Sequence, residues 1–214
     1  MKKIIAVVLV LSSLILAEEY RYNISKIQPE ILERIINGNS YRDNCPVKEV
    51  DLRYIELSYI DFNGKSQIGE LIVHYKVAYS IVKIFRELYN IGYPIRKMSL
   101  VSDFDGSDFA SIEADNTSAF NCRNIAGTNR WSNHAYGKAI DINPIENPYI
   151  SRSGKISHKK SLKYRKRNHT NNTPANRAMI ASNDKIIKIF AKYGWSWGGY
   201  WKSIKDYQHF EYKK

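Results

Sequence analysis

Four side chains in the C-terminal half could together hold a metal ion and move a proton. His134 and Asp141 lie seven residues apart, and His209 lies far along the chain with Asp206 three residues before it. Two imidazoles and one carboxylate are the protein ligands of many catalytic zinc sites, which keep a fourth position open. Calcium and magnesium prefer shells made only of oxygen. A histidine and an aspartate seven residues apart are by themselves a weak signal, and Asp206 with His209 could be an ordinary surface pair, so the residue types suggest hydrolysis without establishing it.

Proton transfer and charge stabilisation would need two residues besides the three metal ligands. A free carboxylate such as Asp206, beside a metal site, can take a proton from attacking water and give it to a leaving amine. Arg123 supplies a fixed positive fork that could polarise a scissile carbonyl or hold a substrate carboxylate. Glu211 is a rival for the role of base, because strand alternation places it on the same face as His209.

Short strands are predicted to position these residues. Alternation over Ala139–Asn143 turns Asp141 to one face and its isoleucine neighbours to the core. Gly137 allows the chain to turn between His134 and this strand. A second strand is expected over 209–212, where His209 and Phe210 point in opposite directions.

The remaining pattern favours an α+β fold over a parallel, doubly wound sheet. Helical spacing predicts helices over 29–36 and 77–88, and a third that begins at a Ser182 cap and ends at Gly194. Further strands are expected over 52–62, 69–75, 95–101 and 118–123, with a tight turn at Asn63-Gly64. Residues 102–117 and 150–176 are predicted to be loops. His74 is expected to be a structural histidine.

Composition indicates a folded, basic protein. The 214 residues include 33 Lys and Arg against 21 Asp and Glu, a net charge of +12, and 43% are hydrophobic. This excludes a disordered or fibrous chain. Positive charge concentrates in 155–167, which suits a polyanion or an anionic matrix. No nucleic-acid-binding motif accompanies it, so we expect no nucleic-acid partner.

The N-terminal segment predicts export. Two lysines followed by a 14-residue apolar run are typical of a signal peptide, expected here over 1–17, although Ile15 is a poor match for the cleavage rule and an uncleaved anchor is the alternative. No later segment is expected to span a membrane. We therefore expect an N-terminal extension over 18–50, a catalytic domain over 51–214 and a periplasmic or cell-wall location. In an oxidising compartment Cys45 and Cys122 favour a disulfide over two separate buried thiols.

Two motifs resemble one peptidase family. Residues 132–141 fit the pattern S-x-H-x-x-G-x-A-x-D, and residues 206–209 fit D-x-x-H. Together, and in this order, they resemble the M15 family of zinc D-alanyl-D-alanine carboxypeptidases, and the L-alanyl-D-glutamate peptidases of phage endolysins in particular. Residues 116–123, 139–149 and 194–201 also look like this family.

The resemblance implies a specific site and fold. It implies a small central antiparallel sheet, flanked by helices, that carries Zn²⁺. The implied residues are the zinc ligands His134, Asp141 and His209, the base and acid Asp206, the substrate-contacting Arg123 and Ser132, and Trp197 with Trp201 as a cleft wall. Core packing is the alternative role of these tryptophans, and orientation of the loop is the alternative role of Ser132.

The implied substrate is the stem peptide of peptidoglycan. Removal of a terminal D-alanine is the leading expectation for an exported enzyme. Cleavage between L-alanine and D-glutamate is the first alternative. A wall-binding module that keeps the metal only for structure is the second, but such a module has little need of Asp206. A secreted basic protein that binds nucleic acid and a toxin-like hydrolase are weaker alternatives.

Overall fold

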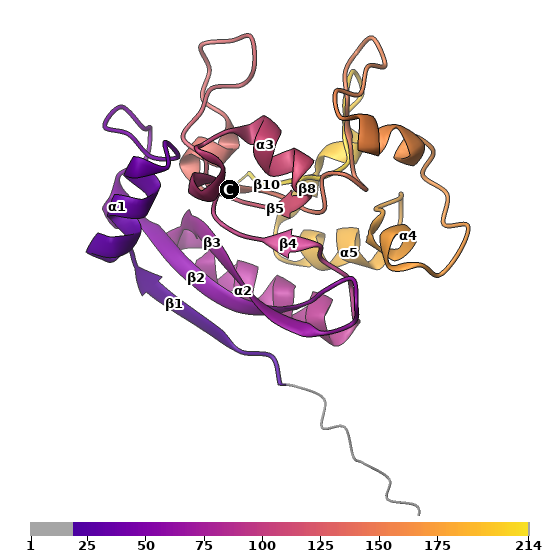
Figure 1. The fold of residues 1–214 in the computed structure, drawn as a ribbon, viewed down its shortest axis with the longest axis horizontal. Helices are drawn as coiled ribbons and strands as arrows, with labels where there is room; N and C mark the ends of the chain where they lie inside the picture. The colour runs from indigo at the N-terminus through magenta and orange to yellow at the C-terminus, as the bar shows by residue number, and fades with distance from the viewer. Residues whose placement is uncertain (1–18, 214) are drawn as a thin grey trace, which may run out of the picture.

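The computed structural model describes residues 19–213 (Figure 1). The signal peptide expected over 1–17 lies outside these residues. Across 19–213, no helix has the length and apolar character needed to cross a membrane.

The first sheet is built on a hairpin. Strands β1 (Tyr22–Lys26), β2 (Leu52–Ile60) and β3 (Ser66–His74) pair antiparallel in that order. The predicted hairpin and its turn are confirmed, although β3 begins three residues earlier than expected. Asp61 closes the turn, because its carboxylate accepts hydrogen bonds from the backbone N–H groups of Asn63 and Lys65.

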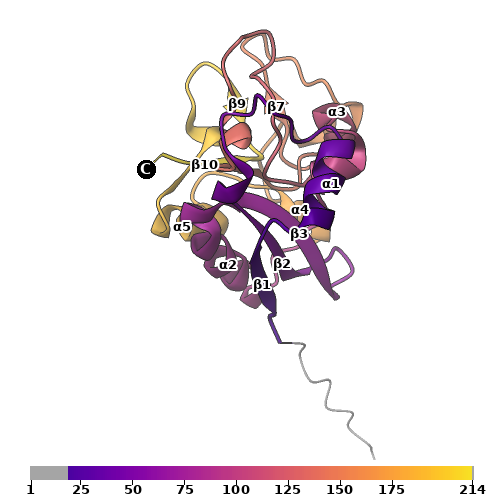
Figure 2. The ribbon, with the colours of Figure 1, turned by 90° about the vertical axis from the view of Figure 1, so that its left-hand side faces the viewer.

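One helix covers this sheet, and a second helix joins it to the other sheet. Helix α2 (Tyr75–Asn90) packs against β2 and buries the predicted apolar face. His74 caps α2 by accepting a hydrogen bond from the Lys76 backbone N–H at 3.1 Å, which confirms its structural role. Helix α5 (Lys185–Lys192) lies beside α2 (Figure 2). The helix begins after Asp184, so the Ser182 cap was wrong.

The second sheet is small and contains two of the segments that carry predicted ligands. Strands β6 (Ala139–Asp141), β10 (His209–Tyr212) and β8 (Trp195–Trp197) form an antiparallel sheet in the order β6-β10-β8. One hydrophobic core joins both sheets. In that core Phe210 stacks on Phe190 of α5, with ring centroids 3.9 Å apart.

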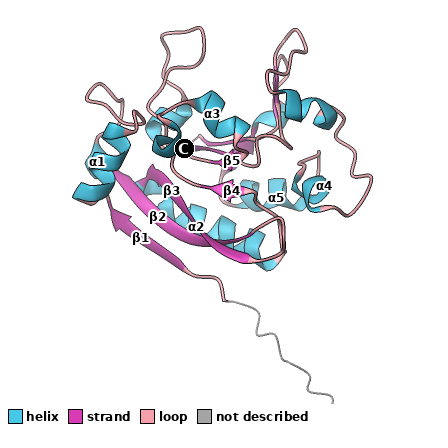
Figure 3. Ribbon diagram, viewed as in Figure 1, coloured by secondary structure: helices cyan, strands magenta, loops and turns pink. Residues whose placement is uncertain are grey.

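Short strands and helices occupy much of the chain between the strands of the two larger sheets (Figure 3). Strands β4 (Lys97–Met98) and β5 (Asn116–Thr117) pair in parallel, and β7 (Tyr149–Ile150) pairs antiparallel with β9 (Lys205–Asp206). The short helices are α3 (Asp108–Glu113) and α4 (Pro174–Ala178). Single 3₁₀ turns occupy Glu49–Asp51, Val101–Phe104, Asn133–Tyr136, Lys159–Tyr164 and Gly198–Tyr200.

Several expectations differ from this arrangement. The predicted loop 102–117 contains α3, because the Ser107 hydroxyl caps the Ala110 N–H at 3.1 Å. The strand expected over 95–101 shrinks to β4, and 118–123 forms only an isolated bridge through Ser118. The fold is mixed α and β with small antiparallel sheets, as expected in class, but the strands divide among four sheets instead of one central sheet.

The N-terminal segment is fastened to the body of the protein. Helix α1 (Pro29–Asn37) confirms the predicted helix and buries Ile35. Cys45 and Cys122 form a disulfide, which confirms the favoured pairing. Arg34 forms ion pairs with Glu70 at 2.7 Å and with Asp103 at 2.8 Å. Strand pairing, a covalent bond and ion pairs thus hold this segment in place.

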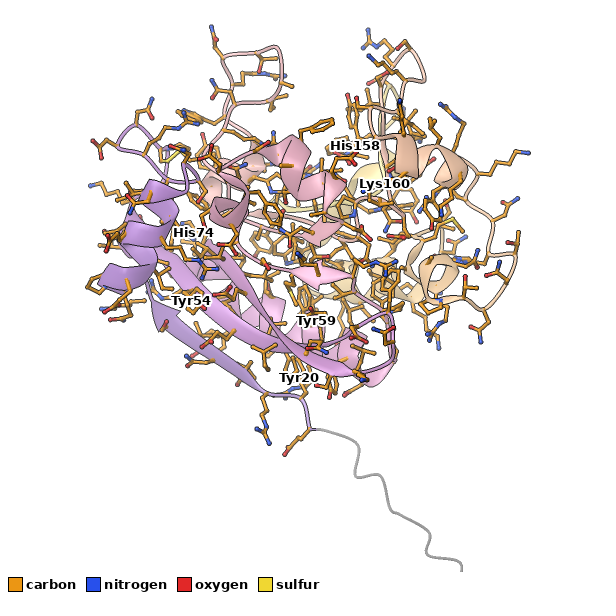
Figure 4. All side chains as sticks on the ribbon, viewed as in Figure 1. Tyr20, Tyr54, Tyr59, His74, His158 and Lys160 are labelled. Atoms are coloured by element: carbon orange, nitrogen blue, oxygen red, sulfur yellow. A yellow bond between two sulfur atoms is a disulfide. The ribbon has the colours of Figure 1, made fainter. Side chains whose placement is uncertain are left out.

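The basic segment 155–167 is also anchored. His158 and Lys160, labelled in Figure 4, both reach Glu113 of α3, at 2.6 and 3.5 Å. The guanidinium of Arg167 donates to the backbone oxygens of Glu146 and Ile180. Part of the positive charge in this segment therefore serves to fix the chain.

A buried carboxyl pair gives the fold a pH-dependent stability. Glu146 is buried beside Asp115, Tyr164 donates to it at 3.3 Å, and the Arg96 guanidinium lies 4.0 Å away. Burial, then the charge of Asp115, raises the pKa of Glu146 to about 8. The folded state thus binds this proton more tightly than the unfolded state does. Its contribution to stability is complete below about pH 4.5 and is lost as the pH rises toward 8.

We expect Glu146→Gln to remove this dependence. The amide stays neutral at every pH, so the stability of the variant relative to wild type should increase from pH 5 to pH 8, by up to about 1.4 kcal/mol per pH unit. Urea unfolding of the metal-free proteins at both pH values measures the difference. The same difference at pH 5 and pH 8 would contradict the assignment.

Candidate metal centre

His134 is held by a capped turn. It lies in the 3₁₀ turn Asn133–Tyr136, where the Ser132 hydroxyl accepts a hydrogen bond from its backbone N–H at 3.3 Å. Gly137 ends the turn with φ of +63°, a conformation that favours glycine. A Cβ at Gly137 would also stand 2.6 Å from the His74 backbone nitrogen. The turn therefore fits against the end of β3 only with glycine there.

Asp141 and His209 are brought together by strand pairing. They are directly opposite each other on β6 and β10. Their neighbours Ile140 and Phe210 are also partners and are fully buried in the core. The alternation predicted from the sequence thus turns the aspartate and the histidine to the same face of the sheet.

The three predicted ligand side chains converge, with one oxygen of Asp141 facing each histidine. His134 Nε2 lies 3.2 Å from Asp141 Oδ2 and 3.3 Å from His209 Nδ1, and His209 Nδ1 lies 3.0 Å from Asp141 Oδ1. Tetrahedral ligands about 2.0–2.1 Å from zinc lie about 3.3 Å from one another. All three residues are buried. The donor set and its spacing therefore fit a zinc ion.

Further contacts orient these side chains. His134 Nδ1 lies 2.5 Å from the backbone oxygen of Ala119, so it donates its proton there and leaves the Nε2 lone pair free. Gln208 donates to Asp141 Oδ2 at 3.3 Å. Sequence reasoning missed both contacts. The Ala119 contact carries no sequence signal, because any residue supplies a backbone oxygen.

The electrostatics of the metal-free cluster follow from this geometry. Burial alone would raise the pKa of Asp141, but the two imidazoles outweigh it and hold that pKa well below its ordinary value. Burial alone would lower the pKa of His209, but the hydrogen bond with Asp141 and the nearby carboxylate of Glu211 raise it to about 10. The cluster therefore exchanges protons for a cation when it binds one.

Asp206 lies beside the cluster on β9. A Cβ built on the buried Gly198 would stand 3.0 Å from the Cβ of Asp206 and 3.3 Å from the Cβ of His209. The Cβ atoms of Asp206 and His209 are therefore both next to Gly198. Asp206 Oδ1 is shielded from solvent and has no hydrogen-bond partner among residues 19–213. Burial raises the pKa of Asp206 to about 7. Such a carboxylate is suited to proton transfer near neutral pH.

Arg123 contributes positive charge close to Asp206, whose pKa it lowers. Its guanidinium pairs with Asp108 at the start of α3, with 2.9 Å between Nη2 and Oδ1. Its Nε is buried and has no acceptor within the described chain. A buried donor without an acceptor fits an anionic or carbonyl group of a substrate. Ser132 acts as a cap, the role that the sequence left as its alternative.

The aromatic residues divide between two roles. Trp197 lies in the core, and its Nε1 donates to the Tyr207 backbone oxygen at 2.8 Å. Its burial favours core packing, the alternative role that the sequence left open. Trp201 is partly exposed and its ring lies 5.3 Å from that of His209, so it borders the site.

Two histidines, an aspartate and a shielded second carboxylate are an arrangement used by metal-dependent hydrolases. Residues 126–212 match a family model described as D-alanyl-D-alanine carboxypeptidase. The match contains His134, Asp141, Asp206 and His209, so the C-terminal part of the chain is similar to this peptidase family. Arg123 lies just outside it. Comparisons with curated proteins and with solved structures gave no match.

Proposed function

We propose that this protein is a zinc-dependent peptidase that hydrolyses peptidoglycan stem peptides. The observation that carries the proposal is the convergence of His134, Asp141 and His209 beside the shielded oxygen of Asp206. The family match supports a peptidase acting on a substrate of this type. The disulfide supports an exported protein that works in the periplasm or the cell wall.

The residues of the chain divide the work of hydrolysis. When bound, zinc would supply Lewis acidity that polarises a carbonyl and makes water more acidic. Asp206 takes the proton of the attacking water at Oδ1 and then gives it to the leaving amine. Arg123 stabilises the negative charge that develops on the substrate or holds its carboxylate. Burial of these groups strengthens each interaction, because less water screens them.

Release of a terminal D-alanine is the cleavage that we propose. Its substrate ends in a free carboxylate, and the unpaired Nε of Arg123 is a donor suited to that group. The description of the matching family supports the same bond. Cleavage between L-alanine and D-glutamate is the alternative, and the products of the digest distinguish the two bonds.

Digestion of purified peptidoglycan tests the proposal. We expect zinc-loaded protein to shorten stem peptides by one alanine, chelator to stop the reaction and added zinc to restore it. Mass spectrometry of the released muropeptides identifies the bond. Separation of the whole stem after L-alanine would identify the endopeptidase instead. No cleavage by protein with one zinc per chain would contradict catalysis and support a wall-binding module.

A further inference from the structure

Glu211 stands behind one of the histidines of the metal centre. It lies on the same face of β10 as His209, as strand alternation predicted. However, its Oε2 is 3.6 Å from His209 Nε2, whereas His209 Nδ1 faces Asp141 and His134. The carboxylate and the metal position are therefore on opposite edges of the same imidazole ring.

Two contacts hold the Glu211 carboxylate in this place. Asn133 donates to Oε2, and Lys213 pairs with Oε1 at 3.2 Å. Asn133 immediately precedes His134 in the 3₁₀ turn. Glu211 thus connects the turn that carries one histidine with the strand that carries the other. The residue is only 7% exposed, so water competes little for these contacts.

The two histidines need opposite tautomers. His134 turns Nε2 to the cluster and gives its Nδ1 proton to the Ala119 backbone oxygen. His209 turns Nδ1 to the cluster, so its remaining proton must sit on Nε2. An acceptor at Nε2 fixes this tautomer, holds the ring plane and makes Nδ1 a stronger ligand. Within residues 19–213, Glu211 is the group that the structure places at that nitrogen.

We infer that Glu211 is a positioning residue of the metal centre, which accepts the Nε2 proton of His209 and so orients this ligand. Its charge also matters, because Asp141 and Glu211 together balance the two positive charges of zinc. The inference rests on the proposed function, since it requires a metal bound through His209 Nδ1. It also excludes Glu211 as the base, because the imidazole separates its carboxylate from the metal.

Zinc affinity of the purified full chain tests this role. Competition with a fluorescent chelator should show that Glu211→Ala binds zinc about 10- to 100-fold more weakly than wild type. Glu211→Gln keeps an acceptor without the charge, so its loss should be smaller. The cobalt-substituted Glu211→Ala protein should show a shifted d–d absorption spectrum. Glu56→Ala removes a strand carboxylate outside the site and should match wild type in both measurements.

The outcomes separate this inference from the proposed function. Wild type that binds no zinc overturns both. Wild type that binds zinc and cleaves stem peptides, with Glu211→Ala equal to it in affinity and cobalt spectrum, overturns only the positioning role. Unchanged affinity with lost cleavage would make Glu211 the base instead. If Glu211→Ala does not fold, Glu211→Gln provides the comparison, and wild-type affinity and spectrum in that variant contradict the inference.

Discussion

Asp206→Asn should lower kcat for stem-peptide cleavage by about 10²- to 10⁴-fold, the usual contribution of a positioned acid or base. The amide has nearly the same shape but cannot take a proton from water. The zinc ligands are left intact, so the variant should still bind one zinc per chain. Steady-state kinetics on a synthetic stem peptide, with metal analysis of the same sample, measure both properties.

The control for this variant is Asp43→Asn, which makes the same change in an exposed loop. It should keep wild-type kcat and zinc content. Asp206→Asn with full activity would remove Asp206 from the mechanism. Loss of zinc together with activity would instead show that Asp206 belongs to the metal shell, since the buried Oδ1 would then be a ligand.

His134→Ala should abolish both zinc binding and cleavage. The substitution removes one of the three converging ligands and leaves only two protein ligands, where a catalytic zinc site needs three. The loss of affinity should exceed the 10- to 100-fold typical of an outer partner, because a direct ligand is removed. Chelator competition and peptidoglycan digestion at equal protein concentration measure the two effects.

His169→Ala is the matched control for this variant. That histidine pairs with Asp184 at 2.9 Å on an exposed segment away from the predicted ligands. Its removal should leave zinc affinity and cleavage at wild-type values. Zinc bound by His134→Ala as tightly as by wild type would mean that the metal lies elsewhere, and the proposed centre would be wrong.

Local sequence signals predicted the elements that carry the site. Alternation around Asp141 and His209 was sufficient to predict β6 and β10, because the apolar Ile140 and Phe210 take the core face and leave the polar residues on the other. The apolar spacing that predicted α2 was equally clear. Local signals were weaker between residues 95 and 123, where strands of two residues pair only through tertiary contacts, and the Ser107 cap that starts α3 was missed.

The role of a side chain that depends on its three-dimensional surroundings could not be predicted from local sequence signals. Trp197 looked like a cleft wall and Glu211 like a rival base, because periodicity gives the face of a strand but not what lies beyond it. The fold buries the first in the core and places the second behind an imidazole. The pairing of Arg123 with Asp108 joins segments with no mutual sequence signal.

By itself, the sequence determined the residue types of the centre and the faces on which they lie, since both are encoded in a few neighbouring positions. Only the tertiary structure decided that two imidazole nitrogens and the two carboxylate oxygens of Asp141, from separate segments, make contacts of 3.0–3.3 Å, and which ring nitrogen of each histidine takes part. The physical reason is that such convergence depends on long-range packing and on buried hydrogen-bond partners, which no local pattern specifies.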